Sequence, residues 1–313
     1  MDCPNVSTAA RVAIVVPVFN RAEVVSRTLD SIAHQTLRPL HVVLVDNASV
    51  DDTGRVLRRW AEEVSAPDFR VDVLDCPRPG AAAARNVGLA AVTEPWVMFF
   101  DSDDSMPPGH AAAVAALPDD VDIAGWNVRE VGPTLAGSDG ATDGRILTFV
   151  GHNPQADNLF YGGMATQRWA ARTELIRRVG AWNEDIRYWD DIELGARMLA
   201  QTARIRHLGD SEVKVYVSGD SITSGAAGSP SKALPALDAI AKTLAPIVGG
   251  SRARQWCRVK LAIECGLADR GGLRDGLTLL QSQTSSLKAL AAYYYTRAGH
   301  RGASRILRAL GLI

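Results

Sequence analysis

The stretch WVMFFDSDDS, residues 96–105, decides the fold, because a run of five apolar residues ends abruptly in closely spaced carboxylates. An apolar run of this length between polar residues is typical of a buried strand in a parallel sheet. Asp101, Asp103 and Asp104 would then follow the carboxyl end of that strand, where open α/β sheets bind ligands. Carboxylates this close repel one another unless a cation or a hydrogen-bond donor holds them. The alternative is a solvated turn, because Asp and Ser favour turns.

Strands alternate with helices through the first hundred residues. Apolar, β-branched runs predict strands in RVAIVVPVF, LHVVLVD, RVDVLDC and WVMFF. Apolar residues at helical spacing predict helices between them, in NRAEVVSRTLDSIAHQT, DTGRVLRRWAEEV and GAAAARNVGLAAV. This alternation indicates a parallel sheet with crossover helices, as in a Rossmann-like nucleotide-binding half.

The signal weakens beyond residue 110. VDIAGWNV and EVKVYV predict two further strands, and ARTELIRRVG and DDIELGARMLAQT predict helices. Residues 132–157 are rich in Gly, Asp and Asn, which indicates a long loop. A Gly/Ser stretch at residues 218–231 separates this part from a helical tail.

The composition is that of an ordinary globular protein of 313 residues, with 47% hydrophobic and 22% charged residues. Cys3, Cys76, Cys257 and Cys265 show no Cys-x-x-Cys spacing. If Cys257 and Cys265 share a helix, they lie about 12 Å apart along it and cannot form a disulfide. The start of the chain lacks the pattern of a signal peptide, and no apolar run is long enough to span a membrane. We therefore expect a reduced, cytoplasmic protein.

Three common ligand-binding motifs do not fit the sequence. A dinucleotide-binding dehydrogenase needs Gly-x-Gly-x-x-Gly after its first strand, whereas residues 17–21 read PVFNR. Asp46 imitates the ribose-binding acid of such enzymes, but the match is weak without the glycines. The Walker loop of P-loop proteins is also missing. A calcium loop starting at Asp101 needs Gly and Glu where this chain has Met106 and Ala112.

Five ordered motifs resemble one known family. VVPVFNRAEVVSRTLDSIAHQT, VVLVDNASVDDT, RPGAAAARNVGL and FFDSDD are similar, in this order and spacing, to the inverting family-2 glycosyltransferases of the GT-A fold. The resemblance extends through VGAWNEDIRYWDDIELGARML and covers roughly residues 12–223. It implies an α/β fold: a GT-A Rossmann-like nucleotide-sugar-binding domain with a mixed central sheet at residues 1–225. A C-terminal α-helical region would follow at residues 226–313.

The resemblance also implies which residues bind the donor, a nucleotide sugar that commonly carries UDP. Asp46 matches the acid that accepts a hydrogen bond from the base ring. Arg85 matches an arginine near the diphosphate, where a guanidinium suits anionic oxygens. The implied donor-binding residues are Pro17, Val18, Phe19, Asn20, Asp46, Arg85, Asp101 and Ser102.

A metal ion is the cofactor that the resemblance implies. Asp101 matches an acid associated with the ribose and the metal, and Asp103 matches the direct ligand of Mg²⁺ or Mn²⁺. A hard divalent cation prefers oxygen ligands and neutralises charge on a departing diphosphate, which would explain the close carboxylates. Many relatives carry a histidine near the metal after the last strand, where this chain has Ser218.

The acidic pair in YWDDIELGARML supplies the catalytic candidate. In the family the second acid of such a pair is the base that activates the acceptor hydroxyl, and here it is Asp191. Asp190 with Glu193 three residues later is typical of a capping box, so we assign Asp190 to capping. For Asp191 the alternative is stabilisation of the helix dipole. Trp189 is a candidate for stacking on an acceptor sugar, with a core position as the alternative.

The sequence therefore predicts an inverting glycosyltransferase that acts by metal-assisted single displacement. The donor is a nucleotide-diphosphate sugar, with a UDP-hexose or UDP-N-acetylhexosamine favoured, and the acceptor is a hydroxyl of a glycan or a lipid-linked glycan. The alternative is a catalytically silent nucleotide-sugar-binding or scaffold protein with the same fold. No nucleic-acid partner is expected.

The C-terminal region is basic. Residues 250–313 contain 11 Lys and Arg against three acidic residues, whereas the rest of the chain carries a charge of −9. In the last segment, RGASRILRALGLI, the arginines share one helical face beside an apolar side. Such a helix can lie on an anionic membrane surface, and the alternative is a helical bundle with solvated or paired arginines. Peripheral contact with the inner membrane face is therefore left open.

Overall fold

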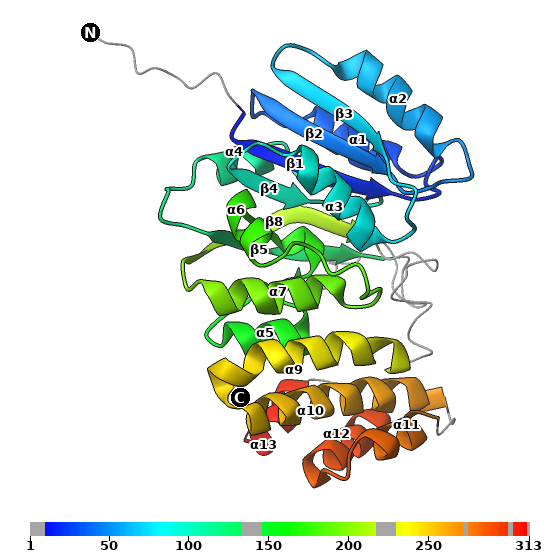
Figure 1. Cartoon of the computed structure of the whole chain (residues 1–313), viewed down its shortest axis with the longest axis vertical. Coiled ribbons are helices and arrows are strands. Elements are labelled where there is room, and N and C mark those ends of the chain that lie inside the picture. Colours follow the sequence, from blue (N-terminus) through cyan, green and yellow to red (C-terminus); the bar gives the residue numbers. More distant parts are fainter. Residues whose placement is uncertain (1–9, 133–145, 217–229, 272–274, 300–302, 312–313) are drawn as a thin grey trace, which may run out of the picture. The chain divides into compact units, whose positions relative to one another are not determined.

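The computed structural model describes residues 10–132, 146–216, 230–271, 275–299 and 303–311 (Figure 1). Within it the chain forms two compact units. The first comprises Met1–Thr148, Thr166–Glu184 and Thr202–Tyr216, and the second comprises Phe149–Ala165, Asp185–Gln201 and Val217–Ile313.

The first unit is built on an eight-stranded mixed sheet. Its strand order is β3-β2-β1-β4-β7-β5-β6, with β8 paired to β5. β1 runs parallel to β2 and β4, and β2 runs parallel to β3, whereas β7 is antiparallel to β4 and β5. The strands are β1 (Val12–Val18), β2 (Leu40–Asp46), β3 (Phe69–Asp75), β4 (Trp96–Phe99), β5 (Ile123–Val131), β6 (Ile146–Leu147), β7 (Trp169–Arg172) and β8 (Ile205–Tyr216). The predicted α/β class and mixed sheet are confirmed.

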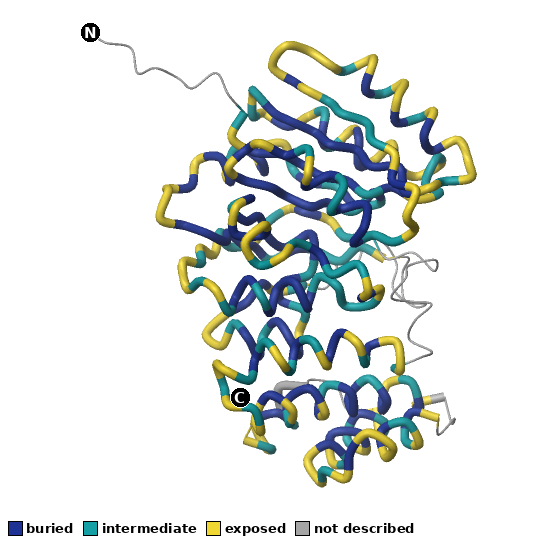
Figure 2. Tube along the Cα trace, viewed as in Figure 1, coloured by how far each residue is buried: buried dark blue, intermediate teal, exposed yellow. Residues whose placement is uncertain are grey.

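Helices flank this sheet (Figure 1). They are α1 (Ser26–Ala33), α2 (Thr53–Val64), α3 (Ala81–Ala91), α4 (His110–Ala115), the 3₁₀ turn η1 (Thr166–Arg168) and α6 (Thr173–Arg178). All of β2 is buried, and in β1 only Pro17 is partly exposed, as expected for strands covered on both faces (Figure 2). α3 packs closely because Gly88 has no side chain: a Cβ there would lie 2.4 Å from a Val15 methyl group.

Two segments differ from the sequence prediction. The segment predicted as one helix, ARTELIRRVG, begins in the strand β7, and the helix α6 starts only at Thr173. The predicted loop at residues 132–157 contains β6 and the start of a helix, α5 (Pro154–Tyr161), although residues 133–145 lie outside the described residues. Both corrections concern short elements, which tertiary pairing and end-capping define more than periodicity does.

The second unit is helical. Besides α5 it contains α7 (Asp190–Gln201), η2 (Pro230–Ala233), α9 (Leu234–Val248), α10 (Gly250–Ala268), η3 (Asp269–Gly271), α11 (Asp275–Gln283), α12 (Leu287–Arg297) and α13 (Ala303–Ala309). Phe160 of α5 and Ile192 of α7 share one hydrophobic core with Leu237 and Trp256 of the C-terminal helices. The predicted domain boundary at residue 225 falls outside the described residues and stays a prediction.

The last described helix turns its apolar residues into this core. Leu307 is fully buried, and Ile306 and Leu310 pack against the same cluster. The Lys288 ammonium donates to the Leu310 carbonyl oxygen at 2.7 Å. The apolar side that a membrane would need is therefore covered by protein. Arg301 lies outside the described residues.

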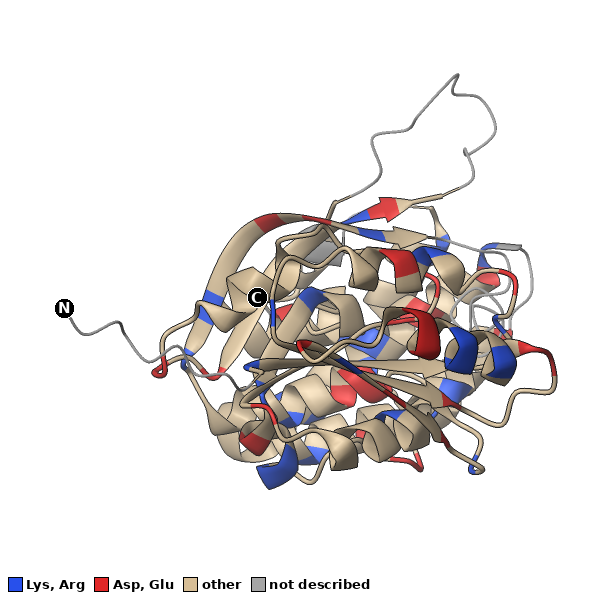
Figure 3. Cartoon of the chain, turned by 90° about the horizontal axis from the view of Figure 1, so that it is seen from above, with Lys and Arg blue, Asp and Glu red and all other residues tan. Residues whose placement is uncertain are grey.

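Other expectations about this unit can also be checked. Cys257 and Cys265 both lie in α10 and are free thiols, as their spacing predicted. In the part of the chain that the structure describes, no helix is long and apolar enough to cross a membrane. In the described part of the chain, both basic and acidic residues lie on helices and on strands (Figure 3).

Candidate active site

The candidate donor residues gather at the carboxyl edge of the first unit's sheet. β1 lies between β2 and β4, and the chain leaves all three strands at the same edge. The strand order reverses at β1, which is the topological switch point where open α/β sheets bind ligands. Phe19 and Asn20 follow β1, Asp46 ends β2, and the DSDD segment follows β4.

The turn after β1 is fixed by the loop that follows β2. Asn20 has a left-handed backbone, with φ of 48°, and its N–H donates to Ser49 Oγ at 3.0 Å. Its side-chain oxygen accepts from the Val50 N–H at 2.9 Å, and the Arg21 N–H donates to Thr53 Oγ1 at 2.8 Å. Phe19 beside it is 52% exposed. This turn therefore presents an aromatic face on a rigid backbone.

The Asp46 carboxylate occupies a tight position at the end of β2. It is 9% exposed, and its Oδ1 accepts from the Ser49 N–H at 3.1 Å. Gly54, in the first turn of α2, makes room for the other oxygen, because a Cβ there would lie 2.6 Å from Asp46 Oδ2. Pro17 and Val18 pair with Val45 and Asp46 in the sheet.

Asp101 is held by two buried side chains. Arg85 of α3 donates from Nη2 to Asp101 Oδ1 at 2.9 Å, and its guanidinium lies 4.4 Å from the centroid of the Trp182 ring. Gln167 donates from Nε2 to Asp101 Oδ2. Both carboxylate oxygens of Asp101 thus accept hydrogen bonds from protein, and Ser102 beside it is buried.

The other two carboxylates of DSDD face different partners. Asp104 is 1% exposed and accepts from the Tyr216 N–H at 2.9 Å. Its burial, reinforced by the charge of Asp101, raises its pKa to about 8. Burial and the charge of Asp101 also raise the pKa of Asp103, while Arg21 Nη2 lies 3.8 Å from Asp103 Oδ2. Asp104 is therefore bound to the backbone in the protein interior, and Asp103 is the acid available to a ligand.

The acidic pair Asp190–Asp191 belongs to the second unit, where it opens α7. Asp191 Oδ1 accepts from the N–H of Ile192 at 2.7 Å, so this acid does support the first turn. The Glu193 carboxylate accepts from Arg197, at 2.8 Å from Nε and 2.6 Å from Nη2, and the assignment of Asp190 to capping stays a prediction. Asp190 is the first helical residue.

The tryptophans divide between core and loop. Trp126 and Trp182 are buried at 2% exposure, so the core position holds for both. Trp189 is partly exposed, has a φ of 62°, and stacks on Tyr188 with ring centroids 5.1 Å apart. Lys260 Nζ lies 4.7 Å from its ring centroid.

A comparison with protein-family models finds a match to one family. Residues 13–137 match the model described as glycosyl transferase family 2. This part of the chain is similar to the family. The match spans the turn after β1, the carboxylates of DSDD and Arg85, so the resemblance found in the sequence is confirmed for this part.

The sequence relatives of this chain are distant. The uncharacterized glycosyltransferase EpsJ of Bacillus subtilis (strain 168) is 24% identical over 216 residues, which are 66% of this chain and 60% of EpsJ. The match spans about three fifths of the length of EpsJ and of the uncharacterized glycosyltransferase YibD of Escherichia coli (strain K12).

Solved structures share the fold. The crystal structure of S. aureus TarS 1-349 in complex with UDP-GlcNAc has a TM-score of 0.62 at 18% identity, covering 91% of this chain and 79% of that one. The mannosyltransferase PcManGT from Pyrobaculum calidifontis, in complex with GDP-Man and Mn²⁺, has a TM-score of 0.56 at 19% identity, covering 93% and 88%. The GT-A-like fold of the family is confirmed.

The candidate site fits a metal ion that is bound together with a diphosphate. Among the described residues, no group of three or more His, Cys, Asp or Glu side chains is arranged to hold an ion. Mg²⁺ is commonly held by one or two carboxylates, with substrate phosphates and water as its other ligands. Asp103 and Asp101 match that donor set, and the raised pKa of Asp103 indicates a charge that a cation would stabilise. Ser218 lies outside the described residues.

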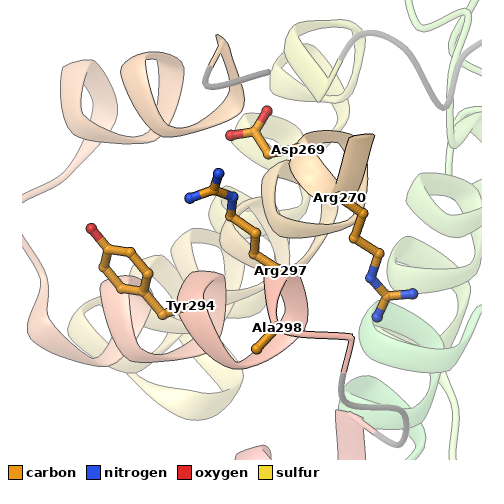
Figure 4. A pocket seen from close by; sticks show the side chains of 5 residues that line it. All are labelled: Asp269, Arg270, Tyr294, Arg297 and Ala298. Carbon is orange, nitrogen blue, oxygen red and sulfur yellow. The ribbon is translucent and has the colours of Figure 1, made fainter. Parts of the chain in front are cut away.

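Two surface hollows lie away from these carboxylates. One, of about 360 Å³, is lined by Asp269, Arg270, Tyr294, Arg297 and Ala298 of the second unit (Figure 4). Its Asp269 accepts from the N–H groups of Gly276 and Leu277 and from the Tyr293 hydroxyl, so it fastens helix ends together. The other, of about 380 Å³, lies at the opposite edge of the sheet, around the starts of β4, β5 and β8.

Gln167 is the site residue that the sequence did not reveal. It comes from η1, far along the chain from Asp101, and its own carbonyl oxygen accepts from Trp126 Nε1 at 2.7 Å. No motif marks it, because a single side-chain amide, here between Thr166 and Arg168, carries no pattern of its own. The roles of all predicted site residues, Asp191 included, stay predictions.

Proposed function

We propose that this chain is an inverting glycosyltransferase that transfers a sugar from a nucleotide-diphosphate donor to a hydroxyl of a glycan or lipid-linked acceptor. The observation that carries the proposal is the cluster at the carboxyl end of β4, where Arg85 and Gln167 hold Asp101 beside Asp103. The UDP-GlcNAc bound to TarS and the GDP-Man bound to PcManGT support a nucleotide-sugar donor. We favour a UDP-hexose or UDP-N-acetylhexosamine.

The donor would lie across the turn after β1 and the ends of β2 and β4. Phe19 and Asn20 would contact the nucleoside, with Asp46 accepting a hydrogen bond from the base. Arg85, whose Nη2 already donates to Asp101, would direct another N–H of its fork at a phosphate oxygen. Buried on a helix and stacked near Trp182, its guanidinium is preorganised for that contact.

Asp103, assisted by Asp101, would hold Mg²⁺ or Mn²⁺. When bound, the ion neutralises negative charge that builds on the diphosphate as the bond to the sugar breaks. This proposal agrees with the Mn²⁺ in PcManGT. Because the leaving group is then stabilised, the protein needs no acid to protonate it.

Asp191 would act as the general base. Its carboxylate would accept the proton of the acceptor hydroxyl while that oxygen bonds to the anomeric carbon and the diphosphate leaves from the opposite face. Its place in the first turn of α7 supports this role, because the positive end of the helix dipole keeps a carboxylate ionised. A single displacement of this kind inverts the anomeric configuration.

The experiment measures UDP release from a panel of UDP-sugars with Mn²⁺, with and without chelator. Asp191→Asn should retain UDP affinity by calorimetry, while transfer falls by about two to four orders of magnitude. The adjacent Asp190→Asn is the matched control and should stay within about tenfold of wild type. Near-normal transfer by Asp191→Asn would remove it as the base.

The same panel tests the silent alternative. A bound nucleotide sugar at a hundred times its dissociation constant stabilises the fold by about 2.7 kcal/mol, which a thermal-shift screen detects. Thermal shifts without turnover on any donor, in the presence of metal and acceptor glycans, would favour a binding or scaffold protein.

A further inference from the structure

The residue before the acidic pair has an unusual backbone. Trp189 has a φ of 62°, in the left-handed region that bulky residues rarely adopt. Its carbonyl oxygen accepts from the Glu193 N–H at 3.0 Å, the first hydrogen bond of α7. The conformation of Trp189 thus sets where Asp190 and Asp191 emerge. Such a conformation persists only when its surroundings hold it.

A lysine that is largely shielded from solvent is part of those surroundings. Lys260 of α10 is only 13% exposed at its side chain, and its ammonium lies 4.7 Å from the centroid of the Trp189 ring. The same ammonium lies 3.0 Å from Glu264 Oε1 and 3.5 Å from the Phe160 carbonyl oxygen. A lysine is almost never buried without partners, and here a carboxylate, a carbonyl and an aromatic face surround it.

The first turn of α7 is fixed from α5 as well. Asn158 donates from Nδ2 to the Ile192 carbonyl oxygen at 2.8 Å. Gly195 packs directly against Met164, and a Cβ at position 195 would lie 2.4 Å from the Met164 side chain. These contacts hold the position of α7. The orientation of the loop before it is therefore the feature on which Lys260 can act.

From these contacts we infer that Lys260 is a positioning residue for the loop that carries Asp191. The inference rests on the proposed function, in which Asp191 is the base. α10 lies beyond the family match, which ends at residue 137. Under this inference the C-terminal helices contribute to the reaction through the loop that carries Asp191. The competing explanation is that Lys260 and Glu264, four residues apart, only stabilise α10.

The test compares Lys260→Met and Lys260→Gln with Lys260→Arg in the full chain. The first two remove the cation and should lower kcat by about 10- to 100-fold, with the donor KM within about twofold of wild type. Lys260→Arg keeps a cation over the ring and should stay within about threefold. Lys242→Met, at an exposed position of α9, is the matched control and should behave as wild type.

A spectroscopic readout separates positioning from stability. The chain has seven tryptophans, so 5-fluorotryptophan labelling gives seven ¹⁹F resonances, of which Trp189→Phe identifies one. Lys260→Met and Lys260→Gln should shift this resonance selectively, and Lys260→Arg should shift it less. A resonance that stays in place, or a kcat within twofold of wild type in both variants, overturns the inference.

Asp191→Asn, measured alongside, keeps the two ideas apart. If it abolishes transfer while the Lys260 variants remain active, the proposed base stands and the positioning role fails. If Asp191→Asn remains active, the proposed base fails, and the ¹⁹F shift alone then decides whether Lys260 fixes the Trp189 loop.

Discussion

His41 offers a perturbation whose size can be worked out from the structure. Its imidazole is 1% exposed, with Nδ1 2.9 Å from Glu94 Oε2 and Nε2 3.1 Å from Asp72 Oδ2. Both ring nitrogens can donate only when the imidazole is protonated. Burial lowers the pKa of His41, but the hydrogen bonds and charges of Glu94 and Asp72 outweigh it, so that the pKa is raised. His41 is therefore buried between two carboxylates that favour its protonated form.

His41→Gln should destabilise the fold by about 3 kcal/mol, at the low end of the cost of breaking a buried ion pair. The cost falls mainly on Glu94, which is 7% exposed and would retain the Thr93 N–H as a donor at 2.9 Å. Asp72 is more exposed and retains Arg70. The double variant His41→Gln, Glu94→Gln should recover part of the loss, because no uncompensated carboxylate then remains buried.

The assay is equilibrium urea unfolding at several pH values. Because the folded pKa of His41 is raised, its contribution is complete below the unfolded value of about 6.5 and is lost as pH rises through the folded pKa. The difference between wild type and His41→Gln should thus be largest near pH 6 and shrink in alkaline solution. A control, Arg59→Gln in an exposed pair with Glu63, should change stability by less than about 0.5 kcal/mol. A His41→Gln effect below about 1 kcal/mol at pH 6, or one that grows with pH, would refute the reasoning.

Three further predictions concern the acidic residues of the candidate site, the packing of α3 and the helix α13. Asp103→Ala should abolish metal-dependent UDP release and Mn²⁺ binding by calorimetry, whereas Asp46→Ala should mainly raise the donor KM; unchanged metal titrations for Asp103→Ala would contradict the ligand assignment. Gly88→Ala should destabilise by about 1–3 kcal/mol in urea, since its Cβ would clash with Val15, and an unchanged midpoint would show that α3 can move. The full chain and a chain ending at residue 298 should pellet equally with anionic vesicles at low salt, since the apolar side of α13 is covered; a loss on truncation would restore membrane contact.

The first four strands and their helices could be predicted from the sequence because the apolar residues of each segment already indicate that it is buried. β1 and β2 are apolar along almost their whole length, and both are covered on two faces. β7 could not be predicted in the same way. It has only four residues, and it becomes a strand because β4 and β5 pair with it on either side. Pairing partners that lie far apart in sequence leave no local pattern.

α5 is a different case, because its signals were present in the sequence. Asn153 accepts from the Ala156 N–H at the helix start, Pro154 occupies the first turn, and Gly162 ends the helix with a φ of 64°. Asparagine followed by proline, with a glycine past the last turn, is a recognisable helix frame. The Gly- and Asp-rich residues before it suggested a loop and obscured that frame.

The candidate site shows the same division. Arg85, Asp101 and Asp103 belong to local motifs, and the structure gathers them at one edge of the sheet. Gln167 enters the site only through the antiparallel return of the chain into β7, so no local pattern could place it beside Asp101. Local motifs therefore predicted the charged residues, whereas only the tertiary structure places Gln167 against Asp101.

The three carboxylates of DSDD also show why spacing alone could not assign their roles. Asp101 is paired with Arg85, and Asp104 accepts from the N–H of Tyr216 in the interior. The pKa values of Asp103 and Asp104 are both raised, and Arg21 Nη2 lies 3.8 Å from Asp103 Oδ2. A carboxyl whose pKa rises on folding makes the folded state lose stability as pH rises above the unfolded value of about 4. Such a cluster costs free energy that a hydrophobic turn would not. A cation bound together with a diphosphate at Asp103 would recover part of this cost, whereas the raised pKa of the buried Asp104 is a cost that ligand binding at Asp103 does not directly offset.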